Sequence, residues 1–186
     1  MGDRHSLAGC FLIATPSLKD PNFEKTVMFM CAHSSEGALG LVINQPYPAT
    51  MDEVMGQLGL SWDRPGDAPV FQGGPVALER GFILFEGEVD IPGHMEVVPQ
   101  LFMGTNPEIL GYLARRDGHE RFFFCLGYAG WSGGQLESEL RENAWLVGKL
   151  DRDILFEMDP DRRWRAAIAA TGIDLVRFVE SRGMMN

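Results

Sequence analysis

The chain has 186 residues, of which 45% are hydrophobic and 23% charged, as expected for a soluble globular protein with one sizeable core. Sixteen Lys and Arg residues against 26 Asp and Glu residues give a formal net charge of -10, which disfavours direct nucleic-acid binding. No apolar run approaches the ~20 residues that cross a bilayer, so we expect no membrane partner and one domain over residues 1–186.

Strand-like runs dominate the first part of the chain. Residues 8–14 form a continuous apolar run of strand length. Residues 26–33 and 38–44 flank a short turn that contains a glycine, and this pattern predicts a β-hairpin.

A helix is predicted over residues 50–59. Thr50 and Glu53 have the spacing of a capping box, and Gly59 suits the position that follows a helix. Residues 70–87 then contain two strand-like pieces around a Gly-Gly-Pro turn.

The middle of the chain continues with strands at 95–104 and 121–128. A helix over residues 106–116 is predicted between them, because Asn106 is a plausible cap and Pro107 fits the first helical position.

The C-terminal part is predicted to add two strands and two helices. Residues 144–150 and 153–159 read as strands joined by a tight turn around Asp151. Residues 159–172 predict a helix and 174–181 a final short one.

The arginines of the first of these helices, Arg162, Arg163 and Arg165, are expected to form a solvated face. Strands outnumber helices along the whole chain, and hairpins join several of them. We therefore predict a mixed α/β or α+β sheet rather than a doubly wound parallel one.

The three cysteines, Cys10, Cys31 and Cys125, each lie in an apolar, strand-like run. An odd number in such settings predicts reduced thiols and a cytoplasmic location. Cys31 and His33 have a spacing that two zinc ligands can use, but alternation places both on one sheet face beside Phe29. Structural zinc needs about four ligands, so we predict no metal site and no cofactor.

The stretch GYAGWSGGQLESEL, residues 127–140, has three possible uses. It contains G-x-S-x-G around Ser132, but no histidine follows Ser132 to serve as its base. It lacks the lysine of a phosphate-binding loop, although free N–H groups at a helix start can hold an anion. The third use is architectural: Ser132 caps a helix while Gln135 bonds back to the cap. Both the architectural role and a modest ligand site stay open.

Four segments carry a family resemblance: LAGCFLIATPSLKDPNFEKTVMFMCAH, EGALGLVINQP, FQGGPVALERGFILF and GYAGWSGGQLESELRENAWL. Together they extend from residue 7 to about residue 150, and the combination resembles the YqgE/AlgH family of small bacterial proteins. The resemblance implies a single α/β domain with a flattened, barrel-like core, a mostly antiparallel sheet and surrounding helices. It implies no established enzymatic activity, and some family members are labelled transcriptional regulators.

We therefore expect a non-enzymatic regulatory or interaction protein that acts through a protein partner or a small ligand, and we assign no catalytic residue. The alternative is an anion-binding or small-ligand protein, or an enzyme, built on loops within the family-matching segments. The candidate ligand residues for that alternative are Asp20, Asn44, Gly73, Gly74, Gly130, Trp131 and Ser132. The sequence does not give the oligomeric state.

Overall fold

A computed structural model describes residues 6–115 and 117–174. Within these residues nine strands form one sheet in the order β6-β7-β5-β8-β3-β2-β1-β9, with β4 paired to β8 beside this path. The strands are β1 (Phe11–Ala14), β2 (Val27–Ser34), β3 (Gly37–Val42), β4 (Val70–Gln72), β5 (Val76–Glu86), β6 (His94–Val98), β7 (Leu101–Gly104), β8 (Phe122–Ser132) and β9 (Trp145–Gly148). The helices are α1 (Met51–Gln57), α2 (Pro107–Leu113), α3 (Gln135–Arg141), α4 (Arg152–Phe156) and α5 (Pro160–Ala170).

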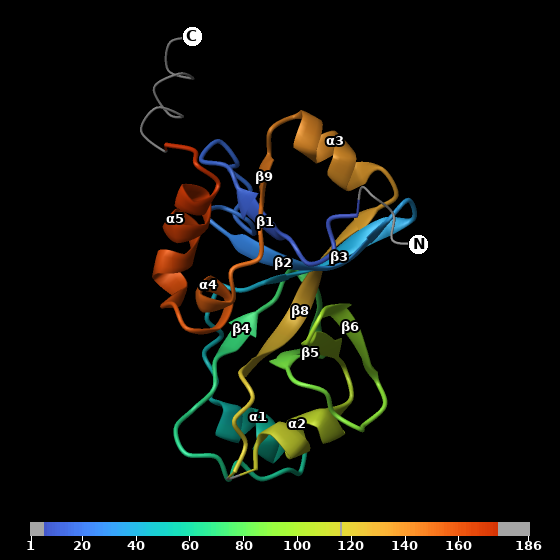
Figure 1. Ribbon diagram of the computed structural model, residues 1–186, viewed down its shortest axis with the longest axis vertical. Helices are drawn as coiled ribbons and strands as arrows, with labels where there is room; N and C mark the ends of the chain where they lie inside the picture. The colour runs from blue at the N-terminus through green and yellow to red at the C-terminus, as the bar shows by residue number, and fades with distance from the viewer. Residues whose placement is uncertain (1–5, 116, 175–186) are drawn as a thin grey trace.

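Strand β8 joins the two halves of the molecule (Figure 1). One end of its 11 residues pairs with β3, and the other lies between β4 and β5. The β4–β8 ladder is parallel, and the other ladders of the described chain are antiparallel. The sheet curls into a half-barrel, which confirms the predicted α+β fold with a mixed, mostly antiparallel sheet.

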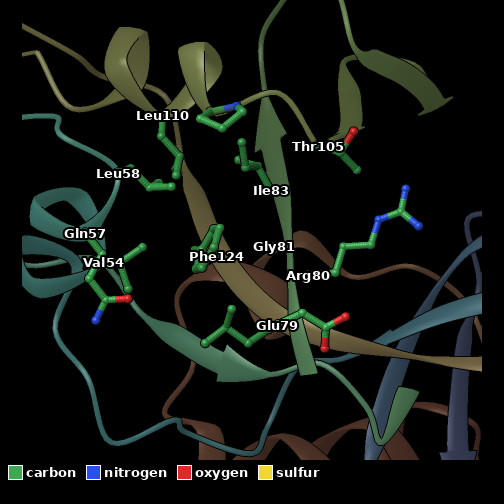
Figure 2. Close-up of a pocket in the computed structure, with 12 residues that line it drawn as sticks. Val54, Gln57, Leu58, Glu79, Arg80, Gly81, Ile83, Thr105, Leu110 and Phe124 are labelled. Atoms are coloured by element: carbon green, nitrogen blue, oxygen red, sulfur yellow. The ribbon is translucent and has the colours of Figure 1, made fainter. Parts of the chain in front are cut away.

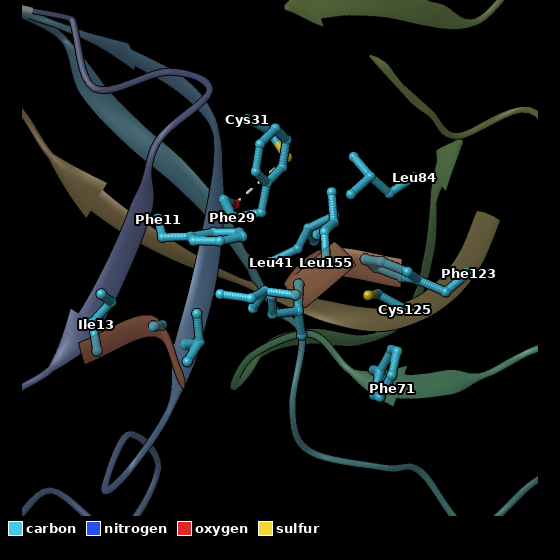
Figure 3. Close-up of a cluster of buried hydrophobic side chains, with 14 of the residues drawn as sticks. Phe11, Ile13, Phe29, Cys31, Leu41, Phe71, Leu84, Phe123, Cys125 and Leu155 are labelled. Atoms are coloured by element: carbon cyan, nitrogen blue, oxygen red, sulfur yellow. Dashed lines mark hydrogen bonds between the residues drawn. The ribbon is translucent and has the colours of Figure 1, made fainter. Parts of the chain in front are cut away.

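The helices divide between the two halves. In Figure 1, α1 and α2 lie together at the lower end, α3 lies at the upper end, and α4 and α5 lie along one side. Alternation along β5 separates two cores: Phe82 and Leu84 belong to the core under α4 and α5, and Ile83 and Phe85 to the core under α1 and α2. Figure 3 shows the first of these cores. A third buried group lies beside α3.

Residues 95–104, predicted as one strand-like run, form two strands. β6 and β7 are antiparallel neighbours joined by a tight turn at Pro99 and Gln100. Gln100 has a φ of 64°, a left-handed conformation that several types of tight turn use. Proline gives no main-chain donor, so the run breaks there into a hairpin.

The predicted hairpin of β2 and β3 is confirmed, but it contains a bulge. The register shifts between Met30 and Ala32, which leaves Cys31 as the extra residue. Cys31 lies in the core with Phe29, whereas the ring of His33 reaches α3 on the other face, where Nε2 is 2.8 Å from a carboxylate oxygen of Glu137. The prediction that Cys31 and His33 share a face is wrong, because one extra residue reverses the alternation.

Residues 153–159 are predicted as a strand, but residues 152–156 form α4 instead. Asp151 is its N-cap: one carboxylate oxygen accepts hydrogen bonds from the main-chain N–H groups of Asp153, at 2.9 Å, and Ile154, at 3.1 Å. The consecutive residues Ile154 and Leu155 are both buried, which one helix face permits and a strand with one buried face does not. The strand predicted over residues 144–150 is confirmed, since it contains β9.

Arg163 contradicts the predicted solvated arginine face. Its neighbours Arg162 and Arg165 are exposed, but Arg163 is only 2% exposed. Its Nε donates to the main-chain oxygen of Met158 at 2.9 Å, and its guanidinium lies 5.2 Å from the centre of the Phe71 ring. Burial lowers the pKa of Arg163 to about 10, so the side chain stays charged at neutral pH. The prediction was wrong because α5 lies against the sheet on the side that carries this residue.

Helix α3 begins two residues later than predicted, and its N-cap is Gly134, with a φ of 78°. Ser132 is the last residue of β8 and caps no helix. Half of the predicted capping box exists, since the side-chain oxygen of Gln135 accepts from the N–H of Ser132 at 3.1 Å. The hydroxyl of Ser132 lies 3.3 Å from the same oxygen rather than bonding a helix N–H. The predicted helix over residues 174–181 lies outside the described residues beyond Asp174.

Candidate functional site

A pocket of about 430 Å³ lies in the lower half of the molecule, where α1 and α2 cover the sheet incompletely (Figure 2). Its volume is in the range of pockets that hold drug-sized ligands. Apolar side chains from four elements line most of it: Val54 of α1, Leu58 just after α1, Ile83 of β5, Leu110 of α2, and Phe124 and Leu126 of β8. The pocket can therefore bury an apolar group.

Gly81 of β5 lets the ring of Phe124 lie against the main chain of β5 at the floor of the pocket. A Cβ atom at this position would lie 2.5 Å from Cζ and 2.6 Å from Cε2 of the Phe124 ring. Such distances are far inside van der Waals contact, so a side chain here and the present position of Phe124 exclude each other. Figure 2 shows Gly81 and Phe124 side by side on neighbouring strands.

Local helix caps hold the two walls in place. Thr50 and Glu53 form the predicted capping box of α1, with the hydroxyl of Thr50 accepting from the N–H of Glu53 at 3.2 Å. The side chain of Asn106 caps α2, and Pro107 is its first residue, both as predicted. Leu58 follows α1 at the mouth and remains 42% exposed.

Charged residues stand at the other side of the mouth. The β5–β8 register shifts between Val76 and Gly81, so the intervening residues arch away from β8. The arch brings Glu79 and Arg80 to the pocket, and both are exposed. The guanidinium of Arg80 lies 5.8 Å from the centre of the Phe82 ring. No ion pair involves Glu79 within the described residues.

Two of the sequence-predicted site residues, Asp20 and Asn44, support the local backbone through their side chains. A carboxylate oxygen of Asp20 accepts from the N–H of Asn22 at 2.9 Å. The side chain of Asn44 accepts from the N–H of Val27 and donates to the carbonyl of Lys25, each at 2.9 Å. Asn44 therefore ties the end of β3 to the start of β2.

Gly73 and Gly74 lie against the main chain of β8. A Cβ at Gly73 would be 2.4 Å from the carbonyl oxygen of Gly127, and one at Gly74 would be 2.1 Å from the carbonyl carbon of Tyr128. Gly74 also has a φ of 155°. Close approach of two backbones explains both glycines.

Gly130, Trp131 and Ser132 lie at the far end of β3 from Asn44. Trp131 is opposite Ala38 in the register, and its indole N–H donates to a carboxylate oxygen of Glu139 at 2.9 Å. The structure thus brings the seven candidates together in small groups, and none of them lines the pocket beside Gly81.

Two of the described histidines, His33 and His94, have other partners than the hydroxyl of Ser132. The Nδ1 of His33 accepts from the N–H of Leu7 at 3.0 Å, and Nδ1 of His94 is 2.8 Å from the carbonyl oxygen of Ile91. For the hydroxyl of Ser132, the side-chain contact in the described chain is with Gln135. Neither geometry places a base beside the serine.

Sequence reasoning missed the pocket residues, although one signal for them was present. Gly81 is an isolated glycine inside an apolar strand pattern, and such a glycine often marks a close approach by another group. The predicted loops were instead those with the glycine pairs Gly73-Gly74 and Gly133-Gly134, because repeated glycines are a clearer sequence pattern than a single one.

The residues that match a known family model include every element that lines the pocket. Residues 11–176 match the model described as AlgH-like. A UPF0301 protein of Magnetococcus marinus is 54% identical over 182 residues, covering 97% of this chain and 98% of that one. The chain belongs to the AlgH-like family. Another relative in this family, a UPF0301 protein of Thioalkalivibrio sulfidiphilus, is 44% identical over 89% of each chain.

Solved structures share this fold. The solution structure of the AlgH protein from Pseudomonas aeruginosa matches with a TM-score of 0.75 and 36% identity over 96% of each chain. A crystal structure of a protein from Corynebacterium diphtheriae matches with a TM-score of 0.64 and 18% identity over 82% of each chain, which shows the common fold alone. Among the helices of the described AlgH-like chain, none has the length and apolar character needed to cross a bilayer.

Proposed function

We propose that this AlgH-like chain is a non-enzymatic interaction protein that binds an apolar group of a partner in the pocket beside Gly81. The single observation that carries the proposal is an apolar cavity of about 430 Å³ with an exposed leucine at its mouth. Exposed apolar surface beside a cavity is a common mark of a binding site, because covering it removes apolar area from water.

Any regulatory role is proposed to act through such a partner rather than through direct contact with DNA. The formal net charge of -10 opposes approach to a phosphate backbone. The exposed arginines of α5, Arg162 and Arg165, lie on one helix face, but the exposed carboxylates of Asp159 and Asp161 stand at the start of the same helix, so α5 presents no broad basic surface.

A matched pair of variants tests the proposal. Leu58 and Val147 are aliphatic residues that are both 42% exposed, and only Leu58 lines the pocket. Leu58→Glu places a charge at the mouth, whereas Val147→Glu makes the same change on β9. The wild type and both variants are immobilised, and proteins captured from bacterial lysate are quantified by mass spectrometry.

A partner that uses the pocket will be captured by the wild type and by Val147→Glu, and depleted at least about tenfold by Leu58→Glu, a loss of about 1.4 kcal/mol. Equal capture by all three proteins would show that the pocket is not the interaction site.

A small ligand is the second candidate, since the pocket volume suits one. A thermal-shift screen of apolar and amphipathic metabolites checks it. A ligand at 100 times its dissociation constant will add about 2.7 kcal/mol of stability, and Leu58→Glu will reduce that gain. A shift that Leu58→Glu leaves unchanged would place the ligand elsewhere.

A further inference from the structure

Strand β5 has a free edge beside the pocket. β7 pairs with β5 only between Ile83 and Glu86, and β7 ends at Gly104. The next residue, Thr105, donates its N–H to the carbonyl oxygen of Gly93 on the β6 side at 3.0 Å, and α2 begins at Pro107. In residues 6–115 and 117–174, no strand is therefore paired with this edge at Gly81.

The main-chain groups of Gly81 point toward the free edge. The N–H of Phe124 donates to the carbonyl oxygen of Pro69, and the carbonyl oxygen of Leu126 accepts from the N–H of Gly73. At these two positions the main-chain groups of β8 therefore point to the β4 side. Bonding direction alternates along a strand, so Cys125 bonds in the opposite direction, toward β5. Cys125 is opposite Phe82 in the register. The main-chain N–H and C=O groups of Phe82 therefore bond to β8. Those of the neighbouring Gly81 point the other way, toward the free edge of β5.

We propose that the partner is an extended peptide, which adds to this edge of β5 as a further strand and inserts an apolar side chain into the pocket. The proposal rests on the proposed function, because it uses the same pocket. Strand addition pairs the free N–H and C=O groups of an edge, and pockets at alternate positions read the side chains. Gly81 has no side chain, and the ring of Phe124 lies against it, so the peptide residue opposite Gly81 can contact that apolar ring.

The charge at the mouth specifies a second residue of the peptide. Glu79 lines the same pocket two positions before Gly81 and has no ion-pair partner among the described residues. The other charged residue at the mouth, Arg80, has its guanidinium 5.8 Å from the ring of Phe82, which belongs to the core on the opposite face of β5. Side chains two positions apart on a strand lie on the same face. The peptide therefore carries Leu or Phe as its anchor and Lys or Arg two positions away. A second copy of this chain is a poorer occupant, because each copy has a formal charge of -10.

Peptide binding to purified protein tests the side-chain part of the proposal. The probe is a capped, fluorescent octapeptide with Leu and Lys two positions apart, measured by fluorescence anisotropy. Leu58→Glu is expected to weaken binding at least about tenfold, and Val147→Glu to leave it unchanged. Glu79→Lys is expected to weaken the binding of this peptide and to strengthen the binding of a peptide with Glu in place of Lys. Equal binding to the wild type and Glu79→Lys would overturn the assigned basic residue.

The main-chain part is tested by methylating the peptide amides one at a time. An added strand presents its N–H groups alternately to β5 and to solvent, so alternate N-methyl groups should each weaken binding about tenfold or more. If N-methylation weakens binding equally at successive positions, the peptide does not add as a strand and the proposal is overturned.

The two proposals fail in distinguishable ways. If no peptide binds but Leu58→Glu still removes a partner from the lysate capture, strand addition is wrong and the pocket remains an interaction site. If peptides bind Leu58→Glu as well as the wild type, they do not use the pocket, and the inference is overturned.

Discussion

Arg163 of α5 donates a hydrogen bond from Nη1 to the main-chain oxygen of Ile43, 120 positions earlier in the chain, at 2.5 Å. The same guanidinium bonds Met158, so one buried cation holds the end of β3, α5 and the segment before α5 together. The carbonyl groups and the Phe71 ring, rather than a buried carboxylate, compensate its charge in the described structure.

Replacement of Arg163 tests this role. Arg163→Met keeps an apolar stem of similar length but leaves the carbonyl of Ile43 without its donor. We expect the free energy of unfolding to fall by about 1–3 kcal/mol in urea denaturation, the cost of an unpaired buried polar group. Arg162→Met, on the exposed side of α5, should change it by less than about 0.5 kcal/mol. A stable Arg163→Met protein would mean that apolar packing can replace the hydrogen bonds.

Glu139 of α3 accepts from two indoles at one oxygen, with Trp131 at 2.9 Å and Trp145 at 2.7 Å. Glu139→Leu leaves both N–H groups without an acceptor, and both tryptophans are buried. We expect a loss of at least about 2 kcal/mol in guanidinium denaturation followed by tryptophan fluorescence. Glu142→Leu, an exposed position after α3, is the control. Equal midpoints for the two variants would show that this carboxylate does not hold α3.

Glu86 links β5 to β8 and α4 through charged hydrogen bonds. Its two carboxylate oxygens lie 2.6 Å from Nε of Arg121 and 2.6 Å from Nη1 of Arg152. Burial raises the pKa of Glu86, but the hydrogen bonds and charges of Arg121 and Arg152 together outweigh it and hold the pKa below its ordinary value of 4.5.

The sign of this shift predicts an acid-sensitive contribution to stability. A carboxyl with a lowered pKa in the folded state stabilises the protein above its unfolded pKa and loses that contribution as the pH falls through the folded pKa. The unfolding free energy of the wild type should therefore decline below about pH 4.5. Glu86→Gln should be less stable at pH 7 and decline less steeply in acid. The free energy of unfolding is measured by urea denaturation at each pH, and Glu142→Gln controls for the loss of one carboxylate. If the plots of this free energy against pH are parallel for the wild type and Glu86→Gln, the prediction is wrong.

Gly74 separates a structural from a ligand-binding role for one of the predicted site residues. Gly74→Ala adds a Cβ that would lie 2.1 Å from the main chain of Tyr128, at a φ of 155°. We expect a loss of about 3 kcal/mol or more, or failure to fold. Gly66→Ala is the control, because Gly66 has a positive φ of 80° but no neighbour within 4 Å of the added atom. A Gly74→Ala protein as stable as Gly66→Ala would show that the two strands can move apart.

Much of the local structure was predictable because its signals lie within a few residues. The capping box of Thr50 and Glu53 marked α1, Asn106 and Pro107 marked α2, and the paired apolar runs marked the hairpin of β2 and β3. Asp151 is predicted to lie in a tight turn but caps α4, because the same residue type serves in both. Whether the residues after Asp151 form a strand or a helix depends on the burial of both Ile154 and Leu155, which the tertiary packing determines.

The class of fold and the acidic character were predictable from the sequence alone, because periodicity, caps and charge are local or additive properties. The family was indicated by four matching segments between residue 7 and about residue 150. Three features come from tertiary packing alone: the burial of Arg163, the bulge at Cys31 that turns His33 toward α3, and the contact of Phe124 with Gly81 in the pocket under α1 and α2. Each of these depends on which distant segment covers a given side chain. That choice is made by the packing of the whole chain, since burial and close contact arise between residues far apart in sequence.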